Sequence, residues 1–230
     1  MIKAILMDFN GVIIDDEPLQ MKAYQEILKG EGIDLTEEDY YASMGMDDRT
    51  FIESAHRRAK RDFTADGVAA IHKAKTAKWR EIVEKEIPLF PGVENFVKKM
   101  SQSFALGIVS MANREEIEFV LEATKMRHDF SIIISAEDVT HCKPNGECYH
   151  KGFNLIDAAR TARGSNPIVH GDCLVIEDSP PGIQAGRAAG LKTLGITNTV
   201  SAQELRDAGA DAVSTSLDDW MPDSMRRVFV

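Results

Sequence analysis

The sequence predicts an α/β fold, a doubly wound parallel sheet with a helical domain inserted after the first strand. From about residue 90 to the C-terminus, short apolar segments alternate with helix-like segments, as in successive βαβ units. From Pro18 to about Ile87 there is no comparable apolar segment, and the periodicity is that of helices rich in Lys, Arg, Glu and Ala. We therefore predict an α/β core of residues 1–15 and 90–230, with a helical cap of residues 16–89.

The core strands are expected where short apolar segments occur. The first is residues 2–9, which end in polar residues and are typical of a buried strand. The other expected strands are residues 105–110, 131–135, 174–177, 192–196 and 212–214. The helices expected between them are residues 93–101, 114–123, 147–162, 182–189 and 202–208. Strands separated by helices of this length predict right-handed crossovers and a parallel sheet covered on both faces.

The inserted segment is expected to be helical throughout. Its first helix has Leu19, Ala23 and Leu28 on one face and ends at Gly30. Residues 48–61 and 65–86 are the further expected helices. An insertion directly after the first strand lies over the carboxyl ends of the strands, where open α/β sheets bind their ligands. This segment is therefore a candidate cap.

The composition excludes several classes of protein. The chain has 230 residues and a formal net charge of -10 at pH 7. Such an acidic chain is unsuited to nucleic acid or anionic membranes, and we expect neither as a partner. Its three cysteines are too few for a disulfide framework or a zinc site, and no apolar segment is as long as a membrane span. Because the first strand begins near the N-terminus, we expect no signal peptide and a cytoplasmic protein.

Polar side chains stand at the carboxyl ends of four expected strands. They are Asp8 and Asn10 after the first, Ser110 after the second, Lys143 after the third, and Glu177 and Asp178 at the end of the fourth. Because parallel strands end at the same edge of a sheet, these side chains are expected to lie together. Carboxylates in a cluster repel one another unless a cation or protons relieve them.

This set of groups favours phosphoryl chemistry. Oxygen ligands completed by water suit Mg²⁺ better than zinc. Mg²⁺ and Lys143 would form a positive pocket for a phosphoryl group, and Ser110 and the backbone N–H of Met111 would donate hydrogen bonds to it. The carboxylate of Asp8 is a candidate nucleophile that would form an aspartyl-phosphate.

The four segments resemble, in order, the four motifs of the haloacid dehalogenase (HAD) superfamily, over nearly the whole chain. Residues 8–19, Asp-Phe-Asn-Gly-Val-Ile-Ile-Asp-Asp-Glu-Pro-Leu, are similar to the opening of the branch that includes beta-phosphoglucomutase and phosphoglycolate phosphatase. Residues 176–186, Ile-Glu-Asp-Ser-Pro-Pro-Gly-Ile-Gln-Ala-Gly, are similar to the fourth motif of that branch. The resemblance implies a HAD-like, Rossmann-like core with a helical cap of the family's first class.

The resemblance also implies roles for single residues. Asp8 would be the nucleophile, and Asp8, the carbonyl of Asn10 and Asp178 would hold Mg²⁺. Glu177 would be a further metal ligand or a partner of one. Ser110 and Lys143 would bind the transferring phosphate, and Lys143 would restrain the charge of the nucleophile.

Asn10 departs from the family pattern, which has Asp there as general acid and base. An amide retains its backbone carbonyl for the metal but does not exchange a proton, and loss of such a catalyst costs about 10²–10⁴ in rate. In one reading Asp16, where the family usually has Ser or Thr, takes over the proton transfer at the mouth between core and cap. In the second, substrates with good leaving groups need little acid help. In the third, the site binds a phosphorylated ligand without turnover. We favour the first two jointly.

The cap contains one more candidate for substrate binding. Residues 45–49, Gly-Met-Asp-Asp-Arg, resemble the loop that sets substrate specificity in this branch. Arg49 would contact the far end of the substrate, or form an ion pair with Asp47 or Asp48 instead. The sequence does not distinguish these alternatives.

The expected function is that of a Mg²⁺-dependent phosphatase acting on a small phosphorylated metabolite through an aspartyl-phosphate on Asp8. One alternative is a phosphosugar mutase of the beta-phosphoglucomutase type, against which Asn10 counts because a mutase needs acid and base in both directions. The other is a weak or inactive protein that binds a phosphorylated metabolite. The oligomeric state is not determined by the sequence, and a monomer is compatible with it.

Overall fold

The core of the molecule is a six-stranded parallel sheet, in a computed structural model that describes residues 1–230. The strand order is β3-β2-β1-β4-β5-β6, so the chain winds outward from β1 in both directions. The strands are β1 Ala4–Met7, β2 Ala105–Val109, β3 Phe130–Ile134, β4 Cys173–Glu177, β5 Lys192–Ile196 and β6 Ala212–Ser214. The doubly wound α/β fold expected from the sequence is confirmed. Its ligand site is expected at the carboxyl end of β1, where the winding reverses.

Helices cover both faces of the sheet, because the side chains of each strand alternate between the two faces. On β1, Ile5 and Met7 join one apolar cluster, and Ala4 and Leu6 join the other. The first cluster includes side chains of α5 Val93–Ser101, α6 Arg114–Ala123 and α10 Pro222–Val228. The second includes side chains of α7 Glu147–Ala162 and α8 Pro180–Ala188. The short helix α9 Ala202–Asp207 packs at the edge formed by β5 and β6.

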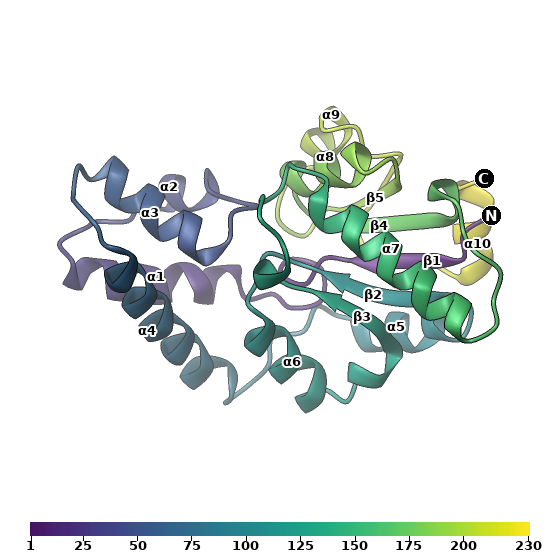
Figure 1. Cartoon of the computed structure of the whole chain (residues 1–230), viewed down its shortest axis with the longest axis horizontal. Helices are drawn as coiled ribbons and strands as arrows, with labels where there is room; N and C mark the ends of the chain where they lie inside the picture. The colour runs from purple at the N-terminus through teal and green to yellow at the C-terminus, as the bar shows by residue number, and fades with distance from the viewer.

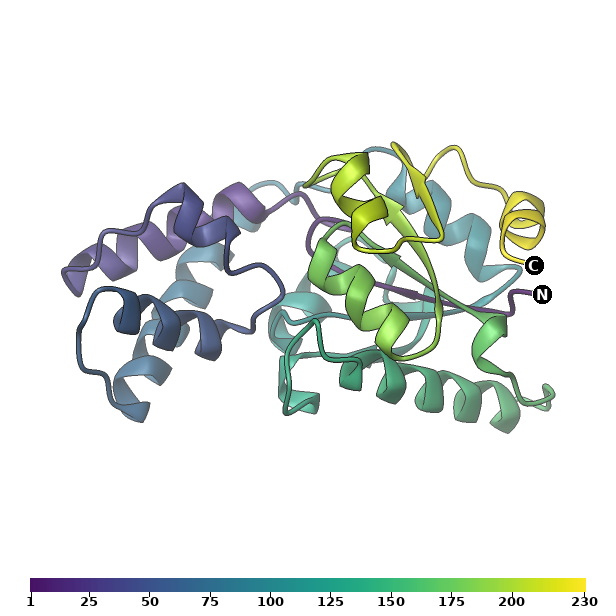
Figure 2. The same cartoon turned by 90° about the horizontal axis from the view of Figure 1, so that it is seen from above.

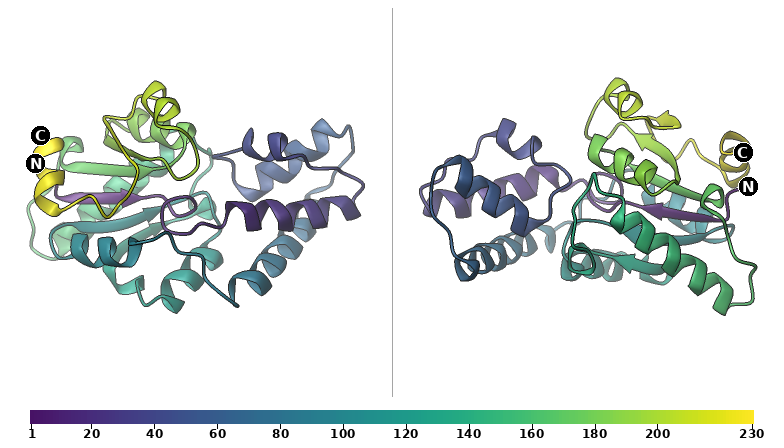
Figure 3. Two further views of the ribbon diagram at one scale, coloured as in Figure 1. Left: turned by 180° about the vertical axis from the view of Figure 1, so that it is seen from behind. Right: turned by 45° about the horizontal axis from the view of Figure 1, so that its top comes forward.

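Four helices follow β1 and form a separate body at one end of the molecule. They are α1 Glu17–Gly30, α2 Glu37–Tyr41, α3 Asp48–Arg58 and α4 Ala65–Val83. Figure 1 shows them beyond one end of the strands, with both chain termini at the opposite end of the core. Figures 2 and 3 show the same arrangement from other directions. These helices share an apolar cluster of their own, of ten buried residues that include Leu28 and Ile52.

Two short segments that run side by side connect the helical body to the core. The backbone N–H of Asp15 donates to the carbonyl of Pro88 at 2.7 Å, and that of Phe90 donates to the carbonyl of Ile13 at 3.2 Å. An antiparallel bridge pairs Ile14 with Leu89 between them. The division at residues 15 and 90 stays a prediction, and this paired connection supports it.

Most expected elements are found within a few residues of their expected ends. The first strand is shorter than expected, and α3 and α4 end at Arg58 and Val83. Helix α8 begins earlier than expected, because proline is well tolerated in a first helical turn and the Ser179 hydroxyl accepts from the backbone N–H of Gly182 at 3.3 Å. Helices α2 and α10 were not expected. Short 3₁₀ turns occur at Arg127–Asp129, Ala136–Asp138 and His170–Asp172.

None of the helices combines the length and apolar character needed to cross a lipid bilayer. The longest helix, α4, has 19 residues and carries charged side chains along its length.

Candidate active site

Asp8 lies directly after β1, at the floor of a cavity between core and cap. The backbone N–H of Asp8 donates to the carbonyl of Ile176 at 3.0 Å, which continues the pairing of β1 with β4. One carboxylate oxygen, Oδ1, accepts from the backbone N–H of Phe9 at 2.7 Å, and Oδ2 lies 2.8 Å from Lys143 Nζ. The sheet, the adjacent backbone and the lysine therefore hold this carboxylate at the cavity.

The loop after Asp8 passes very close to Asp178. Gly11 has a positive φ of 74°, which favours glycine. A Cβ atom added at Gly11 would lie 1.9 Å from Asp178 Oδ2, far inside van der Waals contact. The Asn198 side chain donates to the carbonyl of Gly11 at 2.8 Å and holds the loop in place. Glycine at this position therefore allows the carboxylates of Asp8 and Asp178 to face the same cavity.

Lys143 is buried between two carboxylates. Its ammonium lies 2.8 Å from Asp8 Oδ2 and 2.6 Å from Glu177 Oε1. Burial alone would lower the pKa of Lys143, but the charges of Asp8 and Glu177 outweigh it and raise the pKa above its usual value. The lysine therefore stays positively charged and can share its hydrogen bonds with an incoming phosphate.

Asp8, Glu177 and Asp178 form an acidic cluster whose oxygens lie within 4.8 Å of one another. Burial raises the pKa of Asp178 well above its usual value, and the charges of Glu177 and Asp8 raise it further. A bound cation would relieve this repulsion, and ligands that are all oxygens suit a hard cation such as Mg²⁺. Asp8, Asn10 and Asp178 line the cavity, and no group of the protein donates to the carbonyl of Asn10. These three residues fit the expected ligand set.

Glu177 is less suited to bind the metal directly. Its Oε1 accepts from Lys143 and from the Tyr149 hydroxyl, each at 2.6 Å, and its Oε2 accepts from the Ser179 hydroxyl at 3.1 Å. It is fully buried and does not line the cavity. The geometry supports the alternative in which Glu177 orients its neighbours, here Lys143, rather than coordinating Mg²⁺ itself.

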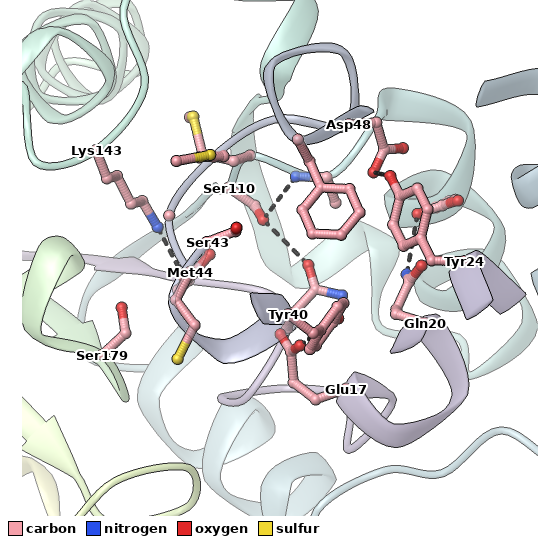
Figure 4. Close-up of a pocket in the computed structure, with 18 of the residues that line it drawn as sticks. Glu17, Gln20, Tyr24, Tyr40, Ser43, Met44, Asp48, Ser110, Lys143 and Ser179 are labelled. Atoms are coloured by element: carbon pink, nitrogen blue, oxygen red, sulfur yellow. Dashed lines mark hydrogen bonds and ion pairs between the residues drawn. The ribbon is translucent and has the colours of Figure 1, made fainter. Parts of the chain in front are cut away.

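Hydrogen-bond donors for a phosphate stand opposite Lys143. Ser110 follows β2 and Met111 follows Ser110, and both line the cavity. The backbone N–H of Met111 has no acceptor within the protein, so it is free to bind a ligand oxygen. Figure 4 shows Ser110 and Lys143 pointing toward the same space. The expected phosphate-binding residues Ser110, Met111 and Lys143 are therefore brought together.

The side chain of Asn10 is held between Ser110 and Asp16. Its Oδ1 accepts from the Ser110 hydroxyl at 3.5 Å, and its Nδ2 donates to Asp16 Oδ1 at 2.8 Å. The other oxygen of Asp16 accepts from Gln20 at 2.9 Å and from the Trp79 indole at 2.7 Å. Asp16 therefore lies between core and cap, where it joins Asn10 to α1 and α4, but it is enclosed by these partners and is not open at the mouth of the cavity.

Asp16 is fully buried and does not line the cavity. Three donors occupy its two oxygens, because a carboxylate in the interior needs such partners. Burial raises the pKa of Asp16, although the hydrogen bond from Asn10 opposes the rise. We therefore assign Asp16 to holding the Asn10 amide in place rather than to the leaving group.

Arg49 also lies elsewhere than expected. Its side chain is 74% exposed and pairs with Glu53 at 3.1 Å, one helical turn further along α3. It does not line the cavity that contains Asp8. The preceding residue, Asp48, lines that cavity instead. Asp47 caps the start of α3, so Asp48 and Arg49 are the first two residues of the helix and their side chains point in different directions around it. The expected ion pair of Arg49 with Asp47 or Asp48 is likewise replaced by the pair with Glu53.

The cap and α6 supply cavity residues that the sequence did not single out. They include Glu17, Gln20, Tyr24, Tyr40, Asp48, Lys75 and Glu116. A usable signal was present in α1, where Glu17, Gln20 and Tyr24 share the face on which Ala23 and Leu28 are buried. Figure 4 shows Glu17 beside Tyr40, and Tyr24 beside Asp48, on the cap side of the cavity.

One end of this wall is centred on Glu17. The Tyr40 hydroxyl donates to Glu17 Oε2 at 2.6 Å. Burial raises the pKa of Glu17 to about 7, and the charge of Asp16 adds to the rise. Glu17 therefore changes its charge near neutral pH.

The other end is centred on Lys75, which joins cap and core. Its ammonium lies 3.1 Å from Asp48 on α3 and 3.1 Å from Glu116 on α6. Burial alone would lower the pKa of Lys75, but the two carboxylates raise it above its usual value. The Tyr24 hydroxyl also donates to Asp48. The single lysine of this wall is therefore already paired with two carboxylates.

Two known proteins are similar to this chain in sequence over most of their length. Protein CbbY of Rhodobacter capsulatus is 26% identical over 201 residues, which cover 84% of each chain. Hexitol phosphatase B of Escherichia coli is 25% identical over 218 residues, which cover 94% of this chain and 93% of the relative.

A solved structure and a family model are similar to this chain as well. The crystal structure of a CbbY mutant from Rhodobacter sphaeroides, in complex with xylulose-1,5-bisphosphate, has a TM-score of 0.81 at 25% identity. The match covers 94% of this chain and 95% of that one. The family model described as haloacid dehalogenase-like hydrolase matches residues 5–196, which extend from β1 to the end of β5 and include Asp8, Ser110, Lys143 and Asp178. The chain therefore belongs to the haloacid dehalogenase-like hydrolase family.

Proposed function

We propose that the protein is a Mg²⁺-dependent phosphatase that acts on a small phosphorylated sugar or related metabolite through an aspartyl-phosphate on Asp8. The observation that carries the proposal is the placement of Asp8 at the cavity floor, with Lys143 at 2.8 Å and Asp178 beside it. A carboxylate in this position reaches a phosphorus atom held by the surrounding donors.

The reaction would proceed in two displacements. A carboxylate oxygen of Asp8 attacks phosphorus, the bond from phosphorus to the ester oxygen breaks, and the electron pair of that bond leaves with the ester oxygen. Water then attacks phosphorus and the bond from phosphorus to Asp8 breaks, which restores the carboxylate and releases inorganic phosphate. One proton of that water stays on the phosphate, and the equivalent of the other neutralises the released ester oxygen through the solvent. Lys143, the Ser110 hydroxyl and the Met111 N–H stabilise the negative charge on the phosphoryl oxygens. Mg²⁺ bound by Asp8, Asp178 and the Asn10 carbonyl would supply further charge neutralisation at those oxygens.

Asn10 decides which leaving groups the site handles well. Its Nδ2 donates to Asp16 and its amide does not release a proton to a leaving oxygen. The carboxylate and phenolate leaving groups of acyl and aryl phosphates depart without being protonated, whereas the alkoxide of an alkyl phosphate needs a proton as it leaves. We therefore expect measurable turnover of acetyl phosphate and p-nitrophenyl phosphate, and turnover of alkyl phosphates about 10²–10⁴-fold below that of a site with an acid at this position.

The test is phosphate release with Mg²⁺ from acetyl phosphate, p-nitrophenyl phosphate and a panel of sugar phosphates. Wild type should release phosphate, and Asp8→Ala should abolish release from every substrate. Asp34→Ala removes an exposed aspartate of the cap and serves as the matched control, with activity like that of wild type. Mg²⁺-dependent binding of sugar phosphates without release from any substrate would contradict the proposal and identify a binding protein.

A further inference from the structure

The cavity wall formed by the cap and α6 carries more negative than positive charge. Glu17, Asp48 and Glu116 contribute carboxyl groups, and Lys75 is the only basic residue among the lining residues apart from Lys143. The formal charge of this wall is therefore -2 with all groups ionised, and 0 with Glu17 and Glu116 protonated. No protonation state of these lining residues that keeps Asp48 ionised makes the wall positive, and His72, which pairs with Asp48 at 3.0 Å, does not line this cavity. Burial indeed raises the pKa of Glu17 and of Glu116, whereas Lys75 lowers the pKa of Asp48 below its usual value.

Lys75 is not available to an anionic ligand. Its side chain is 2% exposed, and its ammonium is bonded to Asp48 at 3.1 Å and to Glu116 at 3.1 Å. A second phosphate or a carboxylate would have to displace one of these carboxylates and leave it buried without its partner, which is costly. Arg49, the first arginine of α3, does not line the cavity and pairs with Glu53.

An unpaired acceptor in the same wall points to the ligand that does fit. Gln20 is buried, and its Nε2 donates to Asp16 and, at 3.3 Å, to Glu116. Two carboxylate partners fix this nitrogen as the donor, so the other terminal atom is the carbonyl oxygen. That oxygen, Oε1, is buried and has no hydrogen-bond partner in the protein. A buried acceptor left unpaired is unfavourable, and it accepts from a hydroxyl but not from a phosphate or a carboxylate.

We propose that this wall binds the non-reacting end of the substrate through its hydroxyl groups, and that the enzyme takes monophosphates of uncharged polyhydroxylated compounds while excluding substrates with a second anionic group. The hydroxyls donate to Gln20 Oε1, to the carboxylates of Glu17 and Asp48, and to the phenolic oxygens of Tyr24 and Tyr40, whose own protons are donated to Asp48 and Glu17. This proposal rests on the phosphatase function proposed above and adds the substrate class.

A wall of this charge disfavours both bisphosphate substrates and the phosphosugar mutase reaction. The crystallised CbbY mutant binds a bisphosphate, and at 25% identity the charges of the two cavities need not agree. A phosphosugar mutase returns the phosphate of its aspartyl-phosphate to a sugar that already carries one, so a bisphosphate must occupy its cavity. A wall that excludes a second phosphate therefore also excludes the mutase reaction.

Substrate pairs that differ by one group test the proposal on the wild-type protein. The pairs are 2-hydroxyethyl phosphate with phosphoglycolate, glycerol 3-phosphate with 3-phosphoglycerate, and fructose 6-phosphate with fructose 1,6-bisphosphate. In each pair the first compound has an uncharged non-reacting end, and the second carries a further anionic group there. At pH 7.5 with saturating Mg²⁺, kcat/KM for the first compound should exceed that for the second by about tenfold or more, because like charges repel in a water-poor cavity. Equal values, or a preference for the anionic member, would overturn the exclusion.

The hydroxyl contacts have a separate test. Ethyl phosphate lacks the hydroxyl of 2-hydroxyethyl phosphate, and its kcat/KM should be about tenfold lower because the acceptors of the wall stay unpaired. Equal values for these two substrates would overturn the hydroxyl recognition.

A variant tests the origin of the discrimination. Glu17→Gln removes one negative charge and keeps an acceptor for the Tyr40 hydroxyl, and it should reduce each ratio of uncharged to anionic substrate several-fold. Glu26→Gln makes the same change on the same helix, at a side chain that pairs with Lys78 outside the cavity, and should leave the ratios unchanged. Identical ratios in the two variants would overturn the charge argument.

The experiment also distinguishes failure of this inference from failure of the proposed function. Phosphate release from p-nitrophenyl phosphate together with a preference for anionic substrates would refute the inference alone. No release from any substrate would refute the proposed function. In that case calorimetric titration of Mg²⁺-loaded wild type with 2-hydroxyethyl phosphate and with phosphoglycolate still tests the inference, since the uncharged compound should bind about tenfold more tightly.

Discussion

Exchanging Asn10 and Asp16 provides a sharp test of the reaction assigned to this site. In the wild type, Asn10 Nδ2 donates to Asp16 Oδ1 at 2.8 Å, while Gln20 and Trp79 donate to Asp16 Oδ2. The double variant Asn10→Asp/Asp16→Asn keeps every one of these bonds. The amide at position 16 donates to the new carboxylate at position 10, and its carbonyl oxygen accepts from Gln20 and Trp79. A carboxyl group then occupies the position next to Ser110, where the wild type has an amide.

The exchange should change the rate, whereas the single substitution at Asn10 should change the stability. An acid at the leaving group contributes about 10²–10⁴ in rate, or about 3–5 kcal/mol, so the double variant should turn over alkyl phosphates faster than wild type by this factor. The single variant Asn10→Asp should behave differently. It replaces a charge-assisted hydrogen bond, worth about 1.5–3 kcal/mol, by two adjacent carboxylates, so it should lose at least that much stability.

The assay compares wild type, both single variants and the double variant on glycerol 3-phosphate and on p-nitrophenyl phosphate, with urea unfolding of each protein. We expect the double variant to unfold near the wild-type midpoint and to gain rate on the alkyl phosphate only. A folded double variant that gains nothing on glycerol 3-phosphate, or gains equally on both substrates, would refute the assignment of the Asn10 position to leaving-group protonation. Equal stability of Asn10→Asp and wild type would refute the pairing with Asp16.

Three further predictions concern stability and metal binding. Lys75→Met leaves the buried Glu116 without a cationic partner, and urea unfolding at pH 7 should show a loss of about 3–5 kcal/mol, most of which the added change Glu116→Gln should recover; no recovery would contradict the pairing. Gly11→Ala places a Cβ 1.9 Å from Asp178 Oδ2, so calorimetric titration should show weaker Mg²⁺ binding, whereas Gly164→Ala, at an exposed turn with free space and a similar φ, should leave Mg²⁺ affinity unchanged. Burial raises the pKa of Glu17 from 4.5 to about 7, so its ionisation opposes folding: the cost is absent below about pH 4.5 and grows as the pH rises to 7. Relative to Glu17→Gln in metal-free buffer, wild type should therefore lose up to about 3 kcal/mol of unfolding free energy between pH 4.5 and 8, and a difference independent of pH would contradict the raised pKa of Glu17.

The core side of the cavity was predictable residue by residue. Asp8, Ser110 and Lys143 each follow a strand, and parallel strands bring their carboxyl ends to one edge wherever the chain has a doubly wound sheet. Local patterns therefore determine which of these groups meet. The resemblance of the surrounding motifs to a known family added their roles.

The cap side of the site was not predictable in the same way. The direction of Arg49 depends on where α3 begins, and the burial of Asp16 depends on contacts with Trp79, which lies 63 residues away in the sequence. The role of Lys75 likewise requires Glu116 from the core to lie against α4. None of these distances is set by a local pattern.

The sequence by itself determined the α/β class, the positions of the strands and the set of groups that gather at their carboxyl ends, because strand periodicity and chain direction are local properties. Only the tertiary structure decided that Asp16 is buried, that Arg49 faces solvent, and that Gln20 and three carboxyl groups surround the far end of the cavity. The physical reason is that burial and pairing of charges depend on how the cap packs against the core, through contacts between residues far apart in the chain.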